Sequence, residues 1–367
     1  MVRAADAPIR ELDVGVYTIP TDAPESDGTL EWSATTLVTV CCSAGNARGV
    51  GYTYADSATA RLIVDKLKPL VVGRDAMDVA GCWDAMVHAI RNLGRPGVCS
   101  MAIAAVDNAL WDLKGRLLDL PLVKLLGQVR SAVPVYGSGG FTSYSDGQLS
   151  EQLSGWVASG IGRVKMKVGR EPQRDVMRAT TARKAIRDAE LFVDANGAYT
   201  RKQALALARA FADQRVTWFE EPVSSDDLQG LHLLRTRGPG GMDISAGEYG
   251  YDLPYFRRML EAQAVDALQA DATRCAGITG FMRVAGLCEA FAIPLSSHCA
   301  PSIHAHPCCA ATPVRHLEWF HDHVRIERML FDGALAPAAG ALQPDLSRPG
   351  LGIELRAADA NRYAVAA

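Results

Sequence analysis

The first part of the chain changes from a strand-like to a helix-like pattern of apolar residues. Residues 1 to about 55 contain three apolar runs typical of strands: LDVGVYTI, ATTLVTVCC and GVGYTY. Residues 21–32, between the first two runs, are polar and contain Gly and Pro, so we expect a loop there. From about residue 56 to 118 the apolar residues recur at helical spacing. This pattern predicts a small α+β unit, which we place at residues 1–125.

The rest of the chain alternates short apolar strands with amphipathic helices. Seven intervening segments, most of them helix-like, separate the strands, and a loop-rich tail follows the last one. This rhythm predicts a closed α/β barrel. With seven intervening segments, the expected fold is a modified TIM barrel, (β/α)7β, at residues 126–340, with a tail at residues 341–367. The eight candidate strands are VPVYGS, RVKMKV, LFVDAN, TWFEEP, DISAGE, ALQADAT, IPLSSH and HLEWF.

Seven consecutive candidate strands each carry an ionisable side chain at or near their ends. In a parallel barrel the carboxyl ends of the strands meet at one rim, where reactive groups gather. Successive groups are 20 to 28 residues apart, which is close to one barrel repeat. One such residue is most often surface charge, but seven in register fit that interpretation poorly. The seven residues are Lys167, Asp194, Glu220, Glu248, Asp271, His298 and Glu318.

Three of these groups are carboxylates on consecutive strands: Asp194, Glu220 and Glu248. Converging carboxylates repel one another unless a cation lies among them. Oxygen ligands favour a hard divalent ion, and Mg²⁺ keeps positions open for substrate and water. The sequence therefore predicts a magnesium site. The alternative is that one of the acids pairs with a lysine instead.

The strand RVKMKV places Lys165 and Lys167 on one face, because successive side chains of a strand point to opposite sides. If this face is the barrel interior, the two ammonium groups need anions near them. We expect the charge of Lys165 to lower the pKa of Lys167 and make it a usable base. On the other side of the ring, Asp271 lies one strand before His298, where it can orient the imidazole.

Composition excludes several classes of function. The net formal charge is −3 and 49% of residues are hydrophobic, which is typical of a globular protein and argues against nucleic-acid or membrane partners. There is no apolar run long enough to span a bilayer, and the N-terminal sequence has no signal-peptide core. The nine cysteines show no CxxC pair, so we expect reduced thiols and a cytoplasmic location.

The order of these motifs resembles the enolase superfamily and, within it, the mandelate racemase subgroup. The resemblance covers nearly the whole chain through VKMKV, VDANGAY, WFEEPV, SAGE, DATRCAGITG, SSH and LEW, and through the helix AIAAVDNALWDLKGRLLDLPLVKLLG. Relatives of the muconate cycloisomerase and dipeptide epimerase types have a lysine on the sixth or seventh strand. This chain has Asp271 and His298 there, which argues against those types.

The resemblance assigns a role to each residue. It implies that Lys167 and the His298–Asp271 pair exchange protons, and that Glu318 is a hydrogen-bond donor or electrophile at the substrate carboxylate. It implies three magnesium ligands, which are Asp194, Glu220 and Glu248. It also implies two further contacts to substrate, which are Lys165 and Asn196. The partner it implies is a small carboxylate substrate, a sugar acid or 2-hydroxy acid, bound to a homo-oligomeric enzyme.

The small N-terminal unit would then be a capping domain, to which the tail returns. Residues 21–32 and 49–54 would close over the barrel mouth, exclude water and select the substrate. The alternative for Trp32, Tyr52 and Tyr54 is plain packing between the domains.

The shared chemistry is removal of the proton next to a carboxylate, which gives an ene-diolate. We expect dehydration of a sugar acid to a 2-keto-3-deoxy acid, by analogy with most of the subgroup. The first alternative is a racemase or epimerase of a 2-hydroxy acid. Two remoter alternatives are a barrel glycosidase that uses Glu220, Glu221 or Glu318 as its carboxylate pair, and a non-catalytic binding protein.

Overall fold

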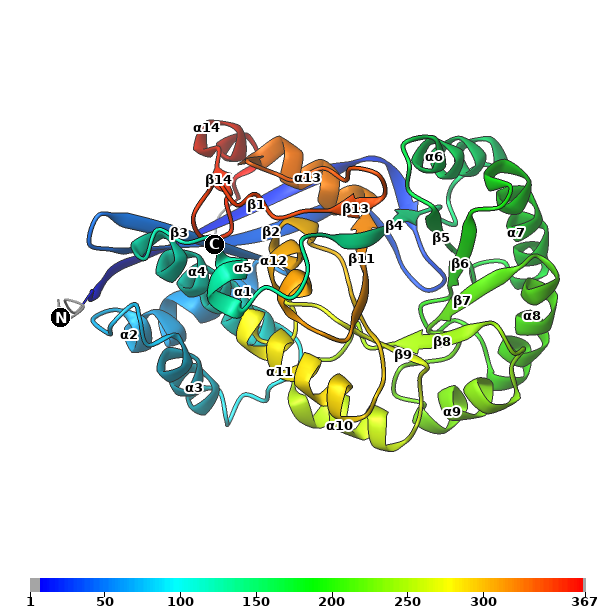
Figure 1. Cartoon of the computed structure of the whole chain (residues 1–367), viewed down its shortest axis with the longest axis horizontal. Coiled ribbons are helices and arrows are strands. Elements are labelled where there is room, and N and C mark those ends of the chain that lie inside the picture. The colour runs from blue at the N-terminus through cyan, green and yellow to red at the C-terminus, as the bar shows by residue number, and fades with distance from the viewer. Residues whose placement is uncertain (1–6, 366–367) are drawn as a thin grey trace.

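The chain forms a barrel with a smaller α+β domain beside it (Figure 1). The computed structural model describes residues 7–365; residues 1–6 and 366–367, the outer ends of the predicted N-terminal domain and tail, lie outside it. Eight parallel strands close into the barrel because β11 pairs with β4, as the sequence predicts. The barrel strands are β4 (Val133–Gly139), β5 (Arg163–Lys167), β6 (Glu190–Asp194), β7 (Val216–Glu220), β8 (Asp243–Ala246), β9 (Ala267–Ala270), β10 (Leu295–Ser297) and β11 (Val314–Phe320).

Seven helices separate these strands, which confirms the (β/α)7β pattern, and they form the outer layer visible in Figure 1. No helix within residues 7–365 is both long enough and apolar enough to cross a bilayer. The seven helices are α6 (Asp146–Ala158), α7 (Pro172–Ile186), α8 (Arg201–Asp213), α9 (Leu228–Arg237), α10 (Leu253–Glu261), α11 (Gly277–Ala290) and α12 (Pro301–Ala310).

The chain after β11 differs from the prediction of a loop-rich tail. A further helix, α13 (His321–Leu330), follows the strand directly. Its buried face includes the polar residues Asp322, His323 and Glu327. An apolar pattern cannot reveal such a helix, because these side chains are buried through hydrogen bonds to the capping domain: Tyr52 Oη donates to Glu327 Oε1 (2.6 Å), and Thr35 donates to Asp322.

The strand RVKMKV has the two faces that the sequence predicts. Val164 and Met166 are buried in the main apolar core, while the side chain of Lys165 is fully buried inside the barrel. Aromatic side chains are neighbours of this lysine across the sheet: Phe192 is in register with Lys165 and stacks on Trp218 (ring centroids 5.4 Å apart). The lysines are therefore interior groups rather than surface charge.

The capping domain is a three-stranded antiparallel sheet of β1 (Ile9–Ser26), β2 (Glu31–Ala44) and β3 (Ala47–Tyr54), with helices on one face. Its longest helix, α4 (Val98–Leu117), lies against β3. Gly51 makes this close approach possible, because a Cβ there would lie 2.3 Å from the backbone nitrogen of Ala109. The other helical segments are α1 (Ala58–Leu62), η1 (Ile63–Leu67), α2 (Lys68–Val71), α3 (Val79–Ala89) and α5 (Leu122–Leu126).

The prediction of a loop at residues 21–32 is wrong. β1 continues to Ser26 and β2 begins at Glu31, so only residues 27–30 form the turn. Pro24 in this stretch is tolerated because β1 is an edge strand, with a shift of register between Pro20 and Glu25. Its polar residues resemble a loop because this hairpin leaves the apolar core and runs toward the barrel, as the long blue strands of Figure 1 show.

The tip of the hairpin docks on the loop after β4. Ser26 Oγ and Thr142 Oγ1 are 2.6 Å apart, the Thr142 backbone N–H donates to Ser26 O (2.8 Å), and Trp32 lies edge-on against Phe141. The hairpin is thus held at the barrel mouth by the barrel itself.

The tail contacts both parts of the chain. β13 (Ala341–Leu342) extends the barrel sheet beside β4, and Val365 N donates to Val16 O (3.0 Å) in the capping domain. The remaining short elements are β12 (Phe331–Asp332), β14 (Glu354–Leu355), α14 (Ala357–Ala360) and η2 (Asn361–Tyr363). The domain boundaries at residues 125 and 340 stay predictions.

A buried acid of the hairpin, Glu25, makes the stability of the protein depend on pH. Glu25 is fully buried; Trp32 Nε1 donates to its Oε2 (2.8 Å), and its Oε1 finds no hydrogen-bond partner within residues 7–365. Burial, together with the charge of Asp322, raises the pKa of Glu25 to about 8. The folded protein therefore holds a proton that the unfolded chain releases above its lower pKa.

Because of this proton, the free energy of unfolding should fall as pH rises from about 4.5 to 8. Glu25→Gln keeps a neutral side chain of the same shape, so its free energy of unfolding should fall less over this window. The two falls should differ by at most about 5 kcal/mol. Denaturant unfolding at pH 5 and pH 9 measures the difference, with the exposed Glu11→Gln as control. Equal pH slopes for Glu25→Gln and wild type would contradict the assignment.

Candidate active site

The structure brings all seven predicted rim groups to the carboxyl end of the barrel. Lys167, Asp194 and Glu220 are the last residues of β5, β6 and β7, and they are paired in register across the sheet. Asp271 and His298 directly follow β9 and β10. The side chains line or adjoin a cavity of about 560 Å³ between the rim and the capping domain.

The three predicted metal ligands form one buried cluster. Asp194, Glu220 and Glu248 each offer an oxygen within 4.8 Å of the other two. Lys167 Nζ lies 2.5 Å from Asp194 Oδ2, and Lys165 Nζ donates to Glu220. The alternative to a metal site is that an acid pairs with a lysine. Two of the three acids, Asp194 and Glu220, do pair with lysines.

These acids still fit a divalent cation, because the pairing is incomplete. Within the described residues, Glu248 Oε2 and the neighbouring Glu221 Oε1 are buried without a hydrogen-bond partner. The rim also holds six carboxyl groups against three lysine or arginine side chains and the imidazole of His298. The acids are Asp194, Glu220, Glu221, Glu248, Asp271 and Glu318, and the cations are Lys165, Lys167 and Arg274. Hard oxygen donors with unmatched charge suit Mg²⁺.

The pKa values of the acids reflect the same imbalance. Burial raises the pKa of Asp194, but Lys167 and Lys165 outweigh it and lower this pKa to about 2. Burial and the charge of Asp194 raise the pKa of Glu220 well above its usual range. For Glu221, burial and the charge of Glu248 do the same. A cation is the group that would allow all of these acids to ionise together.

The expectation that Lys167 has a lowered pKa is wrong. Burial and Lys165 do lower the pKa of Lys167, but Asp194 and the other rim carboxylates outweigh them and raise it. The sequence argument weighed Lys165 without the acid that contacts the amine. Lys167 Nζ also donates to Asn196 Oδ1 (3.1 Å), which places Asn196 beside the lysine at the edge of the cavity.

His298 is held by the predicted carboxylate. Its Nδ1 lies 2.8 Å from Asp271 Oδ2, and Asp271 Oδ1 accepts from the backbone and hydroxyl of Thr273 (2.7 Å each). Despite burial, the hydrogen bond and charge of His298 lower the pKa of Asp271 well below its usual range, so Asp271 is a carboxylate. An Nδ1 proton shared with this carboxylate leaves Nε2 as the atom that exchanges protons in the cavity.

Replacing Asp271 by Asn should therefore impair His298 without removing it. The imidazole loses the acceptor that sets its tautomer, so reactions that need His298 should slow by about 10²- to 10⁴-fold. Steady-state rates on an active substrate measure the loss, with magnesium affinity as the control for an intact rim. A rate within about twofold of wild type would show that Asp271 does not orient the histidine.

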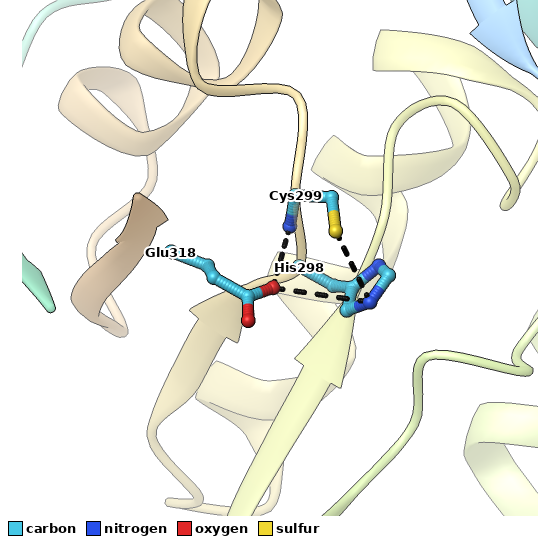
Figure 2. Close-up of side chains that lie close together, drawn as sticks. All are labelled: His298, Cys299 and Glu318. Atoms are coloured by element: carbon cyan, nitrogen blue, oxygen red, sulfur yellow. Dashed lines mark hydrogen bonds and ion pairs between the residues drawn. The ribbon is translucent and has the colours of Figure 1, made fainter. Parts of the chain in front are cut away.

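Glu318 accepts hydrogen bonds at both oxygens. Lys165 Nζ lies 2.8 Å from Oε1, and the backbone N–H of Cys299 donates to Oε2 (2.8 Å; Figure 2). Burial raises the pKa of Glu318, but Lys165 and His298 outweigh it and lower this pKa well below its usual range. Glu318 is thus an ionised acceptor in this state, and the donor role implied by the resemblance requires a proton that it does not hold here.

Sequence reasoning missed two rim residues, Arg274 and Cys299, and named a third, Glu221, only for the glycosidase alternative. Glu221 is the second acid of the doublet at the end of β7. Arg274, three residues after Asp271, lies 3.4 Å from Glu248 Oε1. Cys299 follows His298, and burial raises the pKa of its thiol. The sequence signal that could have identified these residues is their position, one to three residues after a predicted rim group.

The aromatic residues of the capping domain divide between packing and the cavity. Tyr52 is fully buried and its hydroxyl bonds Glu327, which agrees with the packing alternative. Tyr54 stacks on His323 (ring centroids 3.4 Å apart), and both line the cavity together with Trp32.

Comparison with known proteins agrees with this geometry. Residues 148–360 match the family model "Enolase C-terminal domain-like", and residues 16–127 match "Mandelate racemase / muconate lactonizing enzyme, N-terminal domain". The chain belongs to the mandelate racemase/muconate lactonizing enzyme family of the enolase superfamily. It is a magnesium-dependent enzyme of that superfamily, a lyase or an isomerase.

Two curated relatives cover most of the chain. The 3,6-anhydro-alpha-L-galactonate cycloisomerase of Streptomyces coelicolor is 33% identical over 87% of this chain and 88% of its own length. The L-talarate/galactarate dehydratase of Salmonella typhimurium is 31% identical over 78% of this chain and 74% of its own length.

Two solved structures superpose over almost the whole chain. A mandelate racemase/muconate lactonizing enzyme-like protein from Rubrobacter xylanophilus is 55% identical, with a TM-score of 0.96 and coverage of 98% of this chain and 100% of that one. A racemase from Streptomyces coelicolor A3(2) with bound magnesium is 31% identical, with a TM-score of 0.91 and coverage of 97% and 100%.

Proposed function

We propose that this enzyme dehydrates a sugar acid to a 2-keto-3-deoxy acid. The observation that carries the proposal is the placement of Lys167 and His298 on strands five apart in a ring of eight, with the carboxylate cluster between them. The two proton-exchanging groups, Lys167 and His298, can then face opposite sides of one bound carboxylate substrate. Relatives named as dehydratases of galactarate, arabinonate and galactonate support the reaction class.

In the proposed reaction Lys167 takes the proton from C2 of the acid as a free amine. This requires that a cation replace it as the partner of Asp194, because that acid raises the pKa of Lys167. The electrons of the C2–H bond form the double bond of an ene-diolate. Collapse of the ene-diolate expels the 3-hydroxyl, which takes a proton from His298 and leaves as water. The enol that remains tautomerises to the 2-keto-3-deoxy acid.

The other rim residues bind and orient the substrate. Asp194, Glu220 and Glu248 would hold Mg²⁺, which when bound supplies positive charge opposite the charge that develops on the substrate carboxylate. Lys165, already bonded to Glu318, supplies a second fixed charge there, and Asn196 positions the amine of Lys167. The hairpin of β1 and β2, with Trp32 and Tyr54, would limit access of water.

A racemase or epimerase of 2-hydroxy acids uses the same groups, with His298 returning the proton to C2 from the opposite face. The structural similarity to a racemase from Streptomyces coelicolor keeps this as the second candidate.

The nine free thiols fit the reducing cytoplasm, where we place the enzyme. A homo-oligomeric state stays a prediction.

A library of mono- and diacid sugars with Mg²⁺ tests the proposal, read by 2-keto acid formation and by loss of the α-proton signal in D₂O. One or more acids should give both signals. Exchange or inversion without 2-keto acid would favour the racemase. Turnover of a glycoside that persists in EDTA would indicate a glycosidase, and no reaction with any acid would favour a binding protein.

A further inference from the structure

A second donor cluster lies beside the magnesium ligands and shares no residue with them. His298 and Cys299 follow β10, and Glu318 lies on the adjacent β11, with their side chains pointing toward one another (Figure 2). Cys299 Sγ is 3.3 Å from His298 Nε2, which is 3.8 Å from Glu318 Oε2. All three donor atoms lie within 4.8 Å of one another.

The donors and their spacing suit zinc rather than magnesium. Imidazole nitrogen, thiolate sulfur and carboxylate oxygen are the ligands of Zn²⁺, whereas Mg²⁺ prefers oxygen alone. Around a tetrahedral Zn²⁺ neighbouring ligand atoms lie about 3.4–3.6 Å apart. The separations of 3.3 and 3.8 Å are close to this value. Asp271 already holds the other ring nitrogen, which is how metal-binding histidines are commonly oriented.

An unpartnered carboxylate oxygen also faces this cluster. Glu248 Oε2 is buried, accepts no hydrogen bond from any residue in the described part of the chain, and lies 3.4 Å from His298 Nε2. Both Cys299 and Glu318 line the cavity of about 560 Å³, so an ion has room to enter and to keep a water as fourth ligand.

We propose that His298, Cys299 and Glu318 bind a thiophilic divalent cation such as Zn²⁺, and that this ion inhibits the enzyme. The Cys299 thiol releases its proton to solvent as the metal–sulfur bond forms, and no electron is transferred. Nε2 donates its lone pair to the ion and can no longer exchange protons with substrate. Binding stands independently of the proposed function, whereas inhibition rests on it.

Titration of the full-length protein with Co²⁺ at saturating Mg²⁺ tests the binding. A thiolate-to-cobalt charge-transfer band should grow to one ion per chain and disappear in Cys299→Ser. The band should persist in Cys41→Ser, because Cys41 is not one of the proposed ligands. Cys41 is the control because it is half-buried, whereas the other eight cysteines are buried. An absent band in wild type, or an unchanged band in Cys299→Ser, would overturn the proposal. Cobalt bound only by oxygen ligands gives no such band and would also overturn it.

Inhibition is measured with Zn²⁺ at constant Mg²⁺, each variant relative to its own uninhibited rate. The Zn²⁺ concentration that half-inhibits Cys299→Ser should be at least about 10-fold higher than the concentration that half-inhibits wild type. Cys299→Ala provides a second variant should the serine protein not fold. Equal sensitivity of these variants and wild type would refute the inhibitory role. If the proposed function is wrong, the cobalt band should still form. If the metal-binding proposal is wrong, the band should be absent, so the two failures can be distinguished.

Discussion

Glu220→Gln should abolish turnover, by at least about 10³-fold, while the protein stays folded. Glu220 lies at the centre of the carboxylate cluster, where its Oε2 accepts from Trp218 Nε1 (2.9 Å) and Gln269 Nε2 (2.8 Å). Glutamine keeps the shape and one acceptor oxygen but removes the charge that a divalent cation needs.

Thermal unfolding separates this loss of charge from a loss of fold. Mg²⁺ at about 100 times its Kd should stabilise wild type by about 2.7 kcal/mol, and it should stabilise Glu220→Gln much less. Glu151→Gln, at an exposed acid of α6, should behave as wild type. Full activity of thoroughly chelated wild type, or an unchanged magnesium shift in Glu220→Gln, would contradict the metal assignment.

Lys167→Ala should reduce turnover by about 10²- to 10⁴-fold, the range for removal of a general base. The buried amine contacts Asp194 and Asn196 and lines the cavity, so its loss removes the proton acceptor from the lysine side of the substrate. The exposed Lys202→Ala on α8 is the matched control.

Magnesium affinity distinguishes a lost base from a disrupted rim. Lys167→Ala should bind Mg²⁺ at least as tightly as wild type, because Asp194 loses a competing cation. Turnover of Lys167→Ala near the wild-type rate would mean that the strand RVKMKV has only a structural role.

The barrel and its rim could be predicted from the sequence because they depend on local periodicity. Strand ends recur at each barrel repeat, so Lys167, Asp194 and His298 could be assigned to one rim without any knowledge of contacts. The family motifs then suggested roles for Glu318 and Asn196.

The features that the sequence did not reveal depend on contacts between distant segments. Residues 21–26 continue the strand because Glu25 and Ser26 pair with β2 and Ser26 docks on Thr142, although the composition of the stretch is that of a loop. Helix α13 buries Asp322 and Glu327, so its pattern is not apolar. The raised pKa of Lys167 comes from the contact with Asp194, which neighbours it only across the sheet.

The central claim is that Lys167 removes the α-proton and His298 acts afterwards. Proton NMR of an active substrate in D₂O with His298→Asn tests it most directly, with His88→Asn, at an exposed histidine, as control. The account predicts that His298→Asn exchanges the α-proton for deuterium while forming little 2-keto acid, and that Lys167→Ala does neither. Near wild-type formation of 2-keto acid by both variants would contradict it.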